Sequence, residues 1–270
     1  MQIHVHHSTV YEFSQPQSRL IQLLRVTPPS FSGQNVLEWS VDIDRDARMR
    51  SAVDGYGNIV TMLYVDGPLD RIEIVKRGTV YTQDRYGVVT GTNEVLPPMA
   101  YLGTTSLTEA DEAICALAKM VQRRQSNRLA LLHDLMNTIK SKMRFNTGEG
   151  DPYRMAHVAF AEGHGVCQDF AHIFCAAARH LGIPARYVSG HLYQHGGGPA
   201  QDASHAWAEA WIDELGWTGF DIANGVCPDD AYVRVAIGLD YRAAAPLSGS
   251  RMGAGEEKMD VRVHVSQSGQ

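Results

Sequence analysis

One segment, residues 163–190, constrains the fold more than any other part of the chain. It reads GHGVCQDFAHIFCAAARHLGIPARYVSG, and its large apolar side chains recur every three to four residues, which predicts one amphipathic helix from Val166 to Leu181. Gly182 and Pro184 end that helix, and the apolar run after them predicts a buried strand. Two further runs, SHAWAEAWI and WTGFDI, predict neighbouring antiparallel strands, so this half of the chain has α+β character.

The first hundred residues have a different pattern. Alternating runs are separated about every ten residues by Gly, Asn and Pro, which predicts antiparallel strands in a β-sandwich-like domain. Helical periodicity follows over residues 108–124 and 126–143. We therefore predict an α+β protein in three parts: a β-rich N-terminal domain over 1–105, a core with a helix packed on an antiparallel sheet over 106–226, and a C-terminal extension with a final strand over 227–270.

Composition and charge argue against several classes of protein. The net charge of −6 gives no basis for nucleic acid or an anionic membrane as a partner. No apolar run reaches the roughly 20 residues that span a bilayer. The N-terminus alternates polar and apolar residues without a signal-peptide core, so we expect a cytoplasmic protein. Four cysteines without a CxxC pair predict free thiols rather than a disulfide scaffold.

Cys167 lies just inside the start of the predicted helix. The first N–H groups of a helix have no partner within it and the helix dipole is positive there, so this position stabilises a thiolate. The preceding glycines leave room for a substrate backbone, and the cysteine's own N–H can stabilise an oxyanion. These features suit a cysteine acyl-transfer enzyme, although a packing cysteine has the same local context.

A thiolate that attacks an amide needs a partner that returns a proton to the leaving amine. His205 begins the alternating strand SHAWAEAWI, and such a strand can bring its first residue against the helix N-terminus. Asp221 lies on the next strand, where a hairpin through IDELGW brings it beside His205 to orient the imidazole. Cys167, His205 and Asp221 are therefore the candidate catalytic residues.

These same residues carry a family resemblance. The blocks GVCQDFAHIFCAAARHLGIPARYVSGHL and DASHAWAEAWIDELGWTGFDIANG resemble the core of the bacterial transglutaminase-like superfamily, over about residues 110–226. The first hundred residues, with LLRVTPP and DGYGN, resemble the β-rich region often joined to that core. The resemblance implies a papain-like core in which Cys167 is the nucleophile, His205 the general base and acid, and Asp221 the orienting carboxylate. It implies that no cofactor and no metal is required.

The resemblance does not supply a second oxyanion donor. No tryptophan lies between Trp39 and Trp207, and position 161 is Ala where a papain-like enzyme would have a Gln. Gln168, directly after the nucleophile, is the remaining candidate. Glu209 shares the His205 face of its strand, where it either tunes the site or is solvated.

Two other interpretations stay open at this point. His164 with Cys167, and His172 with Cys175, have the spacing of zinc-ligand pairs, although no second compact pair follows. Alternatively, the chain keeps the fold without the chemistry and acts as a binding or scaffolding protein. The three cysteines other than Cys167 are predicted to be packing residues.

The expected activity is acyl transfer on a protein or peptide amide through a thioester on Cys167. Water as the acceptor would make the protein a peptidase or amidase, and a primary amine would make it a transglutaminase. The sequence carries no feature that separates these two outcomes.

Overall fold

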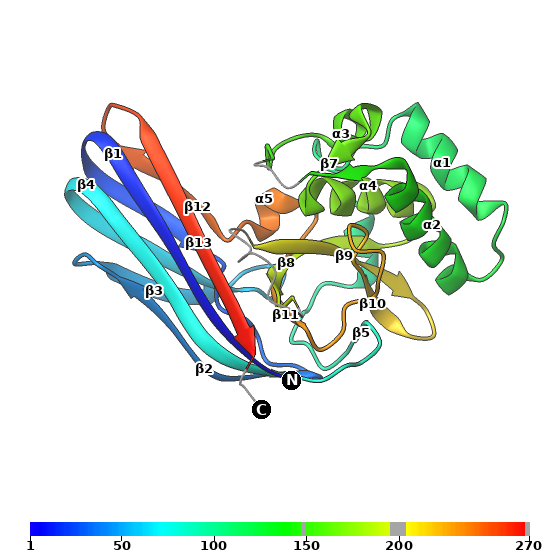
Figure 1. Ribbon diagram of the computed structural model, residues 1–270, viewed down its shortest axis with the longest axis horizontal. Helices are drawn as coiled ribbons and strands as arrows, with labels where there is room; N and C mark the ends of the chain where they lie inside the picture. The colour runs from blue at the N-terminus through cyan, green and yellow to red at the C-terminus, as the bar shows by residue number, and fades with distance from the viewer. Residues whose placement is uncertain (147–149, 195–203, 268–270) are drawn as a thin grey trace.

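The computed structural model describes residues 1–146, 150–194 and 204–267. Figure 1 shows a sheet of long strands beside a second, smaller sheet that carries the helices. The predicted loop HGGGPAQDA, residues 195–203, lies outside the described residues. Within the described residues, no helix is long and apolar enough to cross a membrane.

The N-terminal sheet has six antiparallel strands, with two very long ones at its centre. β1 (Gln2–Leu24) and β4 (Ile59–Thr82) pair along most of their lengths. The shorter strands pair with different halves of these two, and they are β2 (Gln34–Ile43), β3 (Arg48–Val53), β12 (Leu247–Met252) and β13 (Glu257–Gln267). One hydrophobic cluster holds residues from both halves of β1, such as Tyr11 and Leu24. The N-terminal region is thus β-rich as predicted, but its strands form one six-stranded sheet rather than the two packed sheets of a sandwich.

The core sheet has five antiparallel strands in the order β11-β8-β9-β10-β5. They are β11 (Tyr232–Gly238), β8 (Ala185–Leu192), β9 (His205–Ile212), β10 (Gly216–Phe220) and β5 (Val88–Val89). The small side chains Ala208 and Ala210 of β9 share a hydrophobic cluster with the four longer helices. Because alanine occupies little space, a helix can approach this face of the sheet closely.

Four helices pack with the core sheet: α1 (Glu112–Gln122), α2 (Arg128–Lys142), α3 (Ala156–Glu162) and α4 (Cys167–His180). Two short helical segments are also present, η1 (Pro98–Leu102) and α5 (Tyr241–Ala244), together with a parallel strand pair, β6 (Arg144–Phe145) and β7 (His164–Gly165). The helices predicted over 108–124, 126–143 and 166–181 correspond to α1, α2 and α4. The predicted α+β class is therefore confirmed.

The predicted division into three parts differs from the observed pairing of strands. Residues 227–270 do not form a separate extension, because β11 joins the core sheet whereas β12 and β13 join the N-terminal sheet. β5, which the prediction placed in the N-terminal domain, pairs with β10 of the core. The physical reason is that β1 and β8 would otherwise expose unpaired edges, which later segments of the chain satisfy.

Two side-chain amides join the N-terminal part to the edge of β11. The Gln34 amide donates to the carbonyl oxygen of Arg234 (2.9 Å) and accepts from its N–H (2.8 Å). The Asn58 amide makes the same pair of bonds with the backbone of Ile237, both at 2.8 Å. β11 has a strand partner, β8, on one side only, so each amide stands in for a missing partner on the other side.

The interface between the N-terminal sheet and the core also buries three basic side chains. Lys76 of β4, His7 of β1 and His191 of β8 are each at most 3% exposed. The two imidazole rings are 5.7 Å apart, and within the described residues no ion pair involves Lys76. Burial lowers the pKa of Lys76 to about 7, and burial with the Lys76 charge lowers the pKa of His191 to about 3.

We expect Lys76→Met to stabilise the protein at pH 7 by roughly 1–3 kcal/mol. The pKa of Lys76 is about 7 in the folded chain against 10.5 in the ordinary case, so its burial opposes folding fully below pH 7 and progressively less as the pH rises to 10.5. Thermal unfolding of the variant at pH 7 measures the gain, with Lys119→Met on the exposed face of α1 as the control. An unchanged melting temperature would contradict the cost assigned to the buried ammonium.

The same interface predicts that the wild-type protein loses stability in acid. The pKa of His191 is depressed in the folded chain, so the folded state holds the neutral imidazole. The stability associated with that neutral form is present above pH 6.5 and is lost as the pH falls below 6.5. His7 acts in the same direction, because burial and the Lys76 charge lower its pKa too.

Candidate active site

Cys167 is the first residue of α4, where β7 ends. Two side chains fix this turn: Asp169 accepts a hydrogen bond from the N–H of Val166 (2.8 Å) and is itself paired with Arg154. The Asp169 carboxylate therefore caps the helix start, as its place in the first turn suggested. The Cys167 side chain is 7% exposed, and its Sγ donates to Oε1 of Gln168 at 3.3 Å.

His205 and Asp221 form a short hydrogen bond beside this helix start. His205 is the first residue of β9, and Asp221 directly follows β10, which pairs with β9 as the predicted hairpin requires. The imidazole Nε2 lies 2.6 Å from Oδ2 of Asp221. Cys167 interacts electrostatically with the same imidazole and raises its pKa, so the structure brings all three predicted residues together.

The pKa of His205 is raised to about 10. Burial alone would lower it, but the hydrogen bond to Asp221 and the electrostatic interactions with Asp221 and Cys167 outweigh that effect. Asp221 is completely buried. Burial raises the pKa of its carboxyl group, but the contacts with His205 lower it by more, so the net pKa lies below the ordinary value. The site therefore favours an imidazolium that is hydrogen-bonded to the Asp221 carboxylate.

Two residues that the sequence did not single out also hold Asp221. The Tyr232 hydroxyl donates to Oδ2 at 2.8 Å, and the Asn224 side chain donates to the same oxygen at 2.7 Å. The Asn224 N–H donates to Oδ1 at 3.2 Å. Asn224 follows the Asp by three residues and thus had a local signal, that of an Asx-type turn. Tyr232 comes from β11 and had none.

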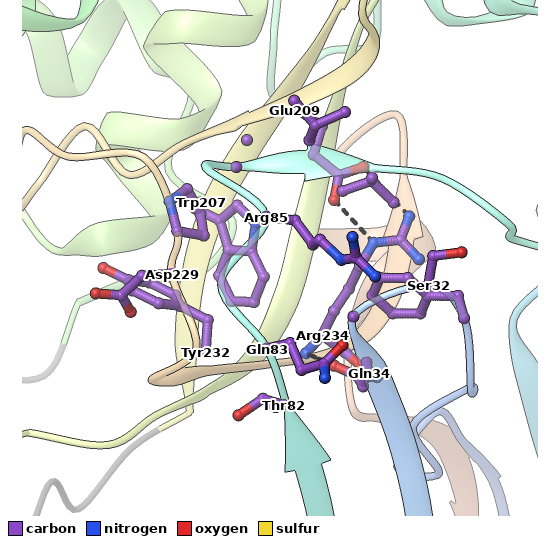
Figure 2. A pocket seen from close by; sticks show the side chains of 17 residues that line it. Ser32, Gln34, Thr82, Gln83, Arg85, Trp207, Glu209, Asp229, Tyr232 and Arg234 are labelled. Atoms are coloured by element: carbon purple, nitrogen blue, oxygen red, sulfur yellow. Dashed lines mark hydrogen bonds and ion pairs between the residues drawn. The ribbon is translucent and has the colours of Figure 1, made fainter. Parts of the chain in front are cut away.

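Glu209 is neither solvated nor part of the site. It is fully buried and pairs with Arg186 (2.6 Å) and Arg234 (2.8 Å), and both arginines also bind Glu94. This network borders a cavity of about 60 Å³ that Trp207 and Tyr232 also line (Figure 2). Because Cys167 does not line it, the cavity is not where the nucleophile meets a substrate.

The remaining candidates have structural partners of their own. His164 contacts the Asn146 amide at 3.0 Å, and His172 accepts from the N–H of Tyr241 at 3.0 Å. Among the described residues no group of three His, Cys, Asp or Glu side chains is arranged to hold a metal ion. Cys175 is completely buried, and burial raises the pKa of its thiol to about 11. Cys115 is half-buried, and its Sγ lies 3.3 Å from Nδ1 of His180.

The fold is that of an α+β protein with a β-rich N-terminal sheet and a core of helices packed on an antiparallel sheet. Residues 116–222 match the transglutaminase-like superfamily, and residues 3–81 match the bacterial transglutaminase-like N-terminal region. The resemblance predicted from the sequence is thereby confirmed.

Relatives with similar sequences span nearly the whole chain. An uncharacterized protein of Mycobacterium leprae is 29% identical over 96% of both chains, and one of Mycobacterium tuberculosis is 27% identical over 91% of this chain and 86% of its own. A protein-glutamine gamma-glutamyltransferase of Pseudomonas aeruginosa is 37% identical over 100 residues, 31% of this chain and 14% of that protein.

A crystal structure of a candidate cysteine protease from Cytophaga hutchinsonii has the same fold. The TM-score between that structure and this one is 0.77 at 21% sequence identity, and the match covers 98% of this chain and 90% of the other chain. The N-terminal sheet and the core thus occur together in both proteins.

Proposed function

We propose that this protein is a cysteine-dependent acyl-transfer enzyme that acts on an amide of a protein or peptide. The observation that carries the proposal is the Cys167 thiol at the start of α4, in electrostatic contact with an imidazole whose Nε2 is 2.6 Å from Oδ2 of Asp221. That arrangement provides a nucleophile, a proton carrier and an orienting carboxylate.

In the proposed reaction, Sγ of Cys167 attacks the carbonyl carbon of the amide. Collapse of the tetrahedral intermediate breaks the C–N bond, and the His205 imidazolium gives its proton to the departing amine. An acyl thioester remains on Cys167. His205 then removes a proton from water or from a primary amine, which attacks the thioester and restores the thiolate. The N–H groups of the first turn of α4 stabilise the oxyanion.

Asp221 makes this proton transfer directional. Because its Oδ2 holds Nε2 of His205, Nδ1 is the nitrogen left to exchange a proton with Cys167 and with the substrate. Gln168 is the side chain nearest in sequence to the reacting sulfur, and its amide contacts Sγ. Its Nε2 group, rather than the Oε1 that contacts Sγ, is therefore the candidate for a second donor to the oxyanion.

The similarity to a protein-glutamine gamma-glutamyltransferase and the fold shared with a candidate cysteine protease support acyl transfer on protein amides. They support both possible acceptors, water and an amine. The acceptor depends on which nucleophile reaches the thioester first, so it is decided by access and concentration rather than by the triad.

We expect the protein to modify dimethylcasein in the presence of dansylcadaverine. Mass spectrometry of the digest distinguishes new peptide ends, conversion of glutamine to glutamate, and attachment of the amine. The adduct fraction should rise with the amine concentration if the amine and water compete for one thioester. Cys167→Ala provides the baseline. Absence of all three products above that baseline would count against acyl transfer on protein amides.

A further inference from the structure

The carboxylate of Asp221 is held by Tyr232, a residue of β11, which is the edge strand of the core sheet. Tyr232 is the first residue of β11 and is 8% exposed. Its hydroxyl donates to the same oxygen, Oδ2, that binds the His205 imidazole. Burial and the Asp221 charge raise the pKa of this phenol, so the hydroxyl keeps its proton and remains a donor.

Two side chains from the N-terminal part hold the backbone on either side of Tyr232. Two residues earlier, the Thr82 hydroxyl donates to the carbonyl oxygen of Asp230 at 2.5 Å. Two residues later, the Gln34 amide pairs with both backbone groups of Arg234. Figure 2 shows Thr82, Gln34, Arg234 and Tyr232 around one cavity. The N–H of Tyr193, next to β8, bonds Ala231 from the other side.

A continuous chain of contacts therefore runs from the N-terminal part to the nucleophile. The Gln34 amide fixes the backbone of β11, β11 carries Tyr232, and the Tyr232 hydroxyl holds Asp221. Asp221 in turn orients the imidazole whose pKa Cys167 raises. Because the carboxylate is completely buried, no solvent donor can replace a lost hydroxyl at once.

We propose that Tyr232 is a positioning residue for the His205–Asp221 pair, and that the N-terminal sheet acts on the catalytic site through it. The inference rests on the proposed function, because it assigns a role to residues around the same thiol. It also gives the N-terminal region a task in catalysis that does not require it to touch the substrate.

The test measures the alkylation rate of Cys167 by iodoacetamide at pH 6, read by peptide mass spectrometry at 25 °C. We expect Tyr232→Phe to lower this rate by a factor of about 10, equal to ~1.4 kcal/mol, since a loosened Asp221 no longer orients the imidazole that stabilises the thiolate. Gln34→Leu should lower it in the same direction but less. Tyr101→Phe is the matched control, because its hydroxyl belongs to the same hydrophobic cluster as Tyr232 without contacting Asp221.

A second readout separates positioning from a general loss of stability. The proton between His205 and Asp221 should give a far-downfield NMR resonance, since the two atoms are 2.6 Å apart. Tyr232→Phe should shift or broaden that resonance, whereas a merely structural role would leave it unchanged in the folded fraction. Melting temperatures of all three variants establish that the comparison is made on folded protein.

The possible failures are distinct. If Tyr232→Phe alkylates at the wild-type rate with an unchanged resonance, Tyr232 is not a positioning residue. If Gln34→Leu melts lower but reacts as the wild type does, the link to the N-terminal sheet is wrong. If the wild type itself reacts like an ordinary thiol, the proposed function fails and takes this inference with it.

Discussion

Replacing Cys167 with alanine should abolish amide turnover, with a loss of at least about 10⁴-fold. The proposed thioester needs the sulfur atom, and no other described thiol lies beside an imidazole–carboxylate pair. Stability should change little, because the residue is at the helix start and its neighbours keep their own partners. The dimethylcasein assay measures the activity, and thermal unfolding measures the stability.

Cys175→Ala is the matched control for this experiment. Its thiol is on the same helix, two turns further along, and is completely buried in the core. The substitution should cost about 1–2 kcal/mol of stability and leave the activity per folded molecule intact. The two variants are therefore expected to differ in opposite ways: Cys167→Ala loses activity and keeps its stability, whereas Cys175→Ala loses stability and keeps its activity per folded molecule. A Cys167→Ala protein that remains active, or a Cys175→Ala protein that is folded but inactive, would refute the assignment of the nucleophile.

His205→Gln should lower turnover by about 10³–10⁵-fold while the chain stays folded. Glutamine can still donate a hydrogen bond to Asp221, so the buried carboxylate is not left without a partner as it would be with alanine. It cannot carry the proton between sulfur and leaving amine. His180→Gln, an exposed histidine at the other end of α4, is the control and should keep full activity.

The same variant gives a pH test with a definite sign. The pKa of His205 is about 10 in the folded chain, above its ordinary 6.5. Its ion pair therefore contributes stability that is complete below pH 6.5 and is lost as the pH rises through about 10. The wild type should exceed His205→Gln in stability most at pH 6 and least above pH 10. A difference that grows toward alkaline pH would contradict the imidazolium assignment.

Local sequence patterns predicted much of the core. The period of residues 163–190 identified α4 to within one residue at each end, because a helix that is buried on a continuous apolar face leaves that period in the sequence. The alternation in SHAWAEAWI identified β9, and the hairpin with β10 placed Asp221 beside His205. Each of these inferences depended on neighbours in the chain.

Long-range pairing was what the sequence could not supply. The run of β11 was assigned to an extension, because nothing local shows that it completes the edge of β8. Tyr232 was therefore not recognised as a partner of Asp221. The burial of Glu209 was equally invisible, since one of its network partners, Glu94, is 115 positions away in the chain (209 − 94). Side chains of this kind are specified by tertiary packing rather than by period or motif.

The central claim is that Cys167 reacts as a thiolate paired with His205. The most direct measurement is the rate of Cys167 alkylation by iodoacetamide from about pH 5 to 9, in the wild type and in His205→Gln, read by peptide mass spectrometry. We predict that the wild type reacts well below the free-thiol pKa of about 8.5, and that the variant loses this low-pH reactivity. Ordinary-thiol profiles in both proteins would contradict a thiolate–imidazolium pair at this site.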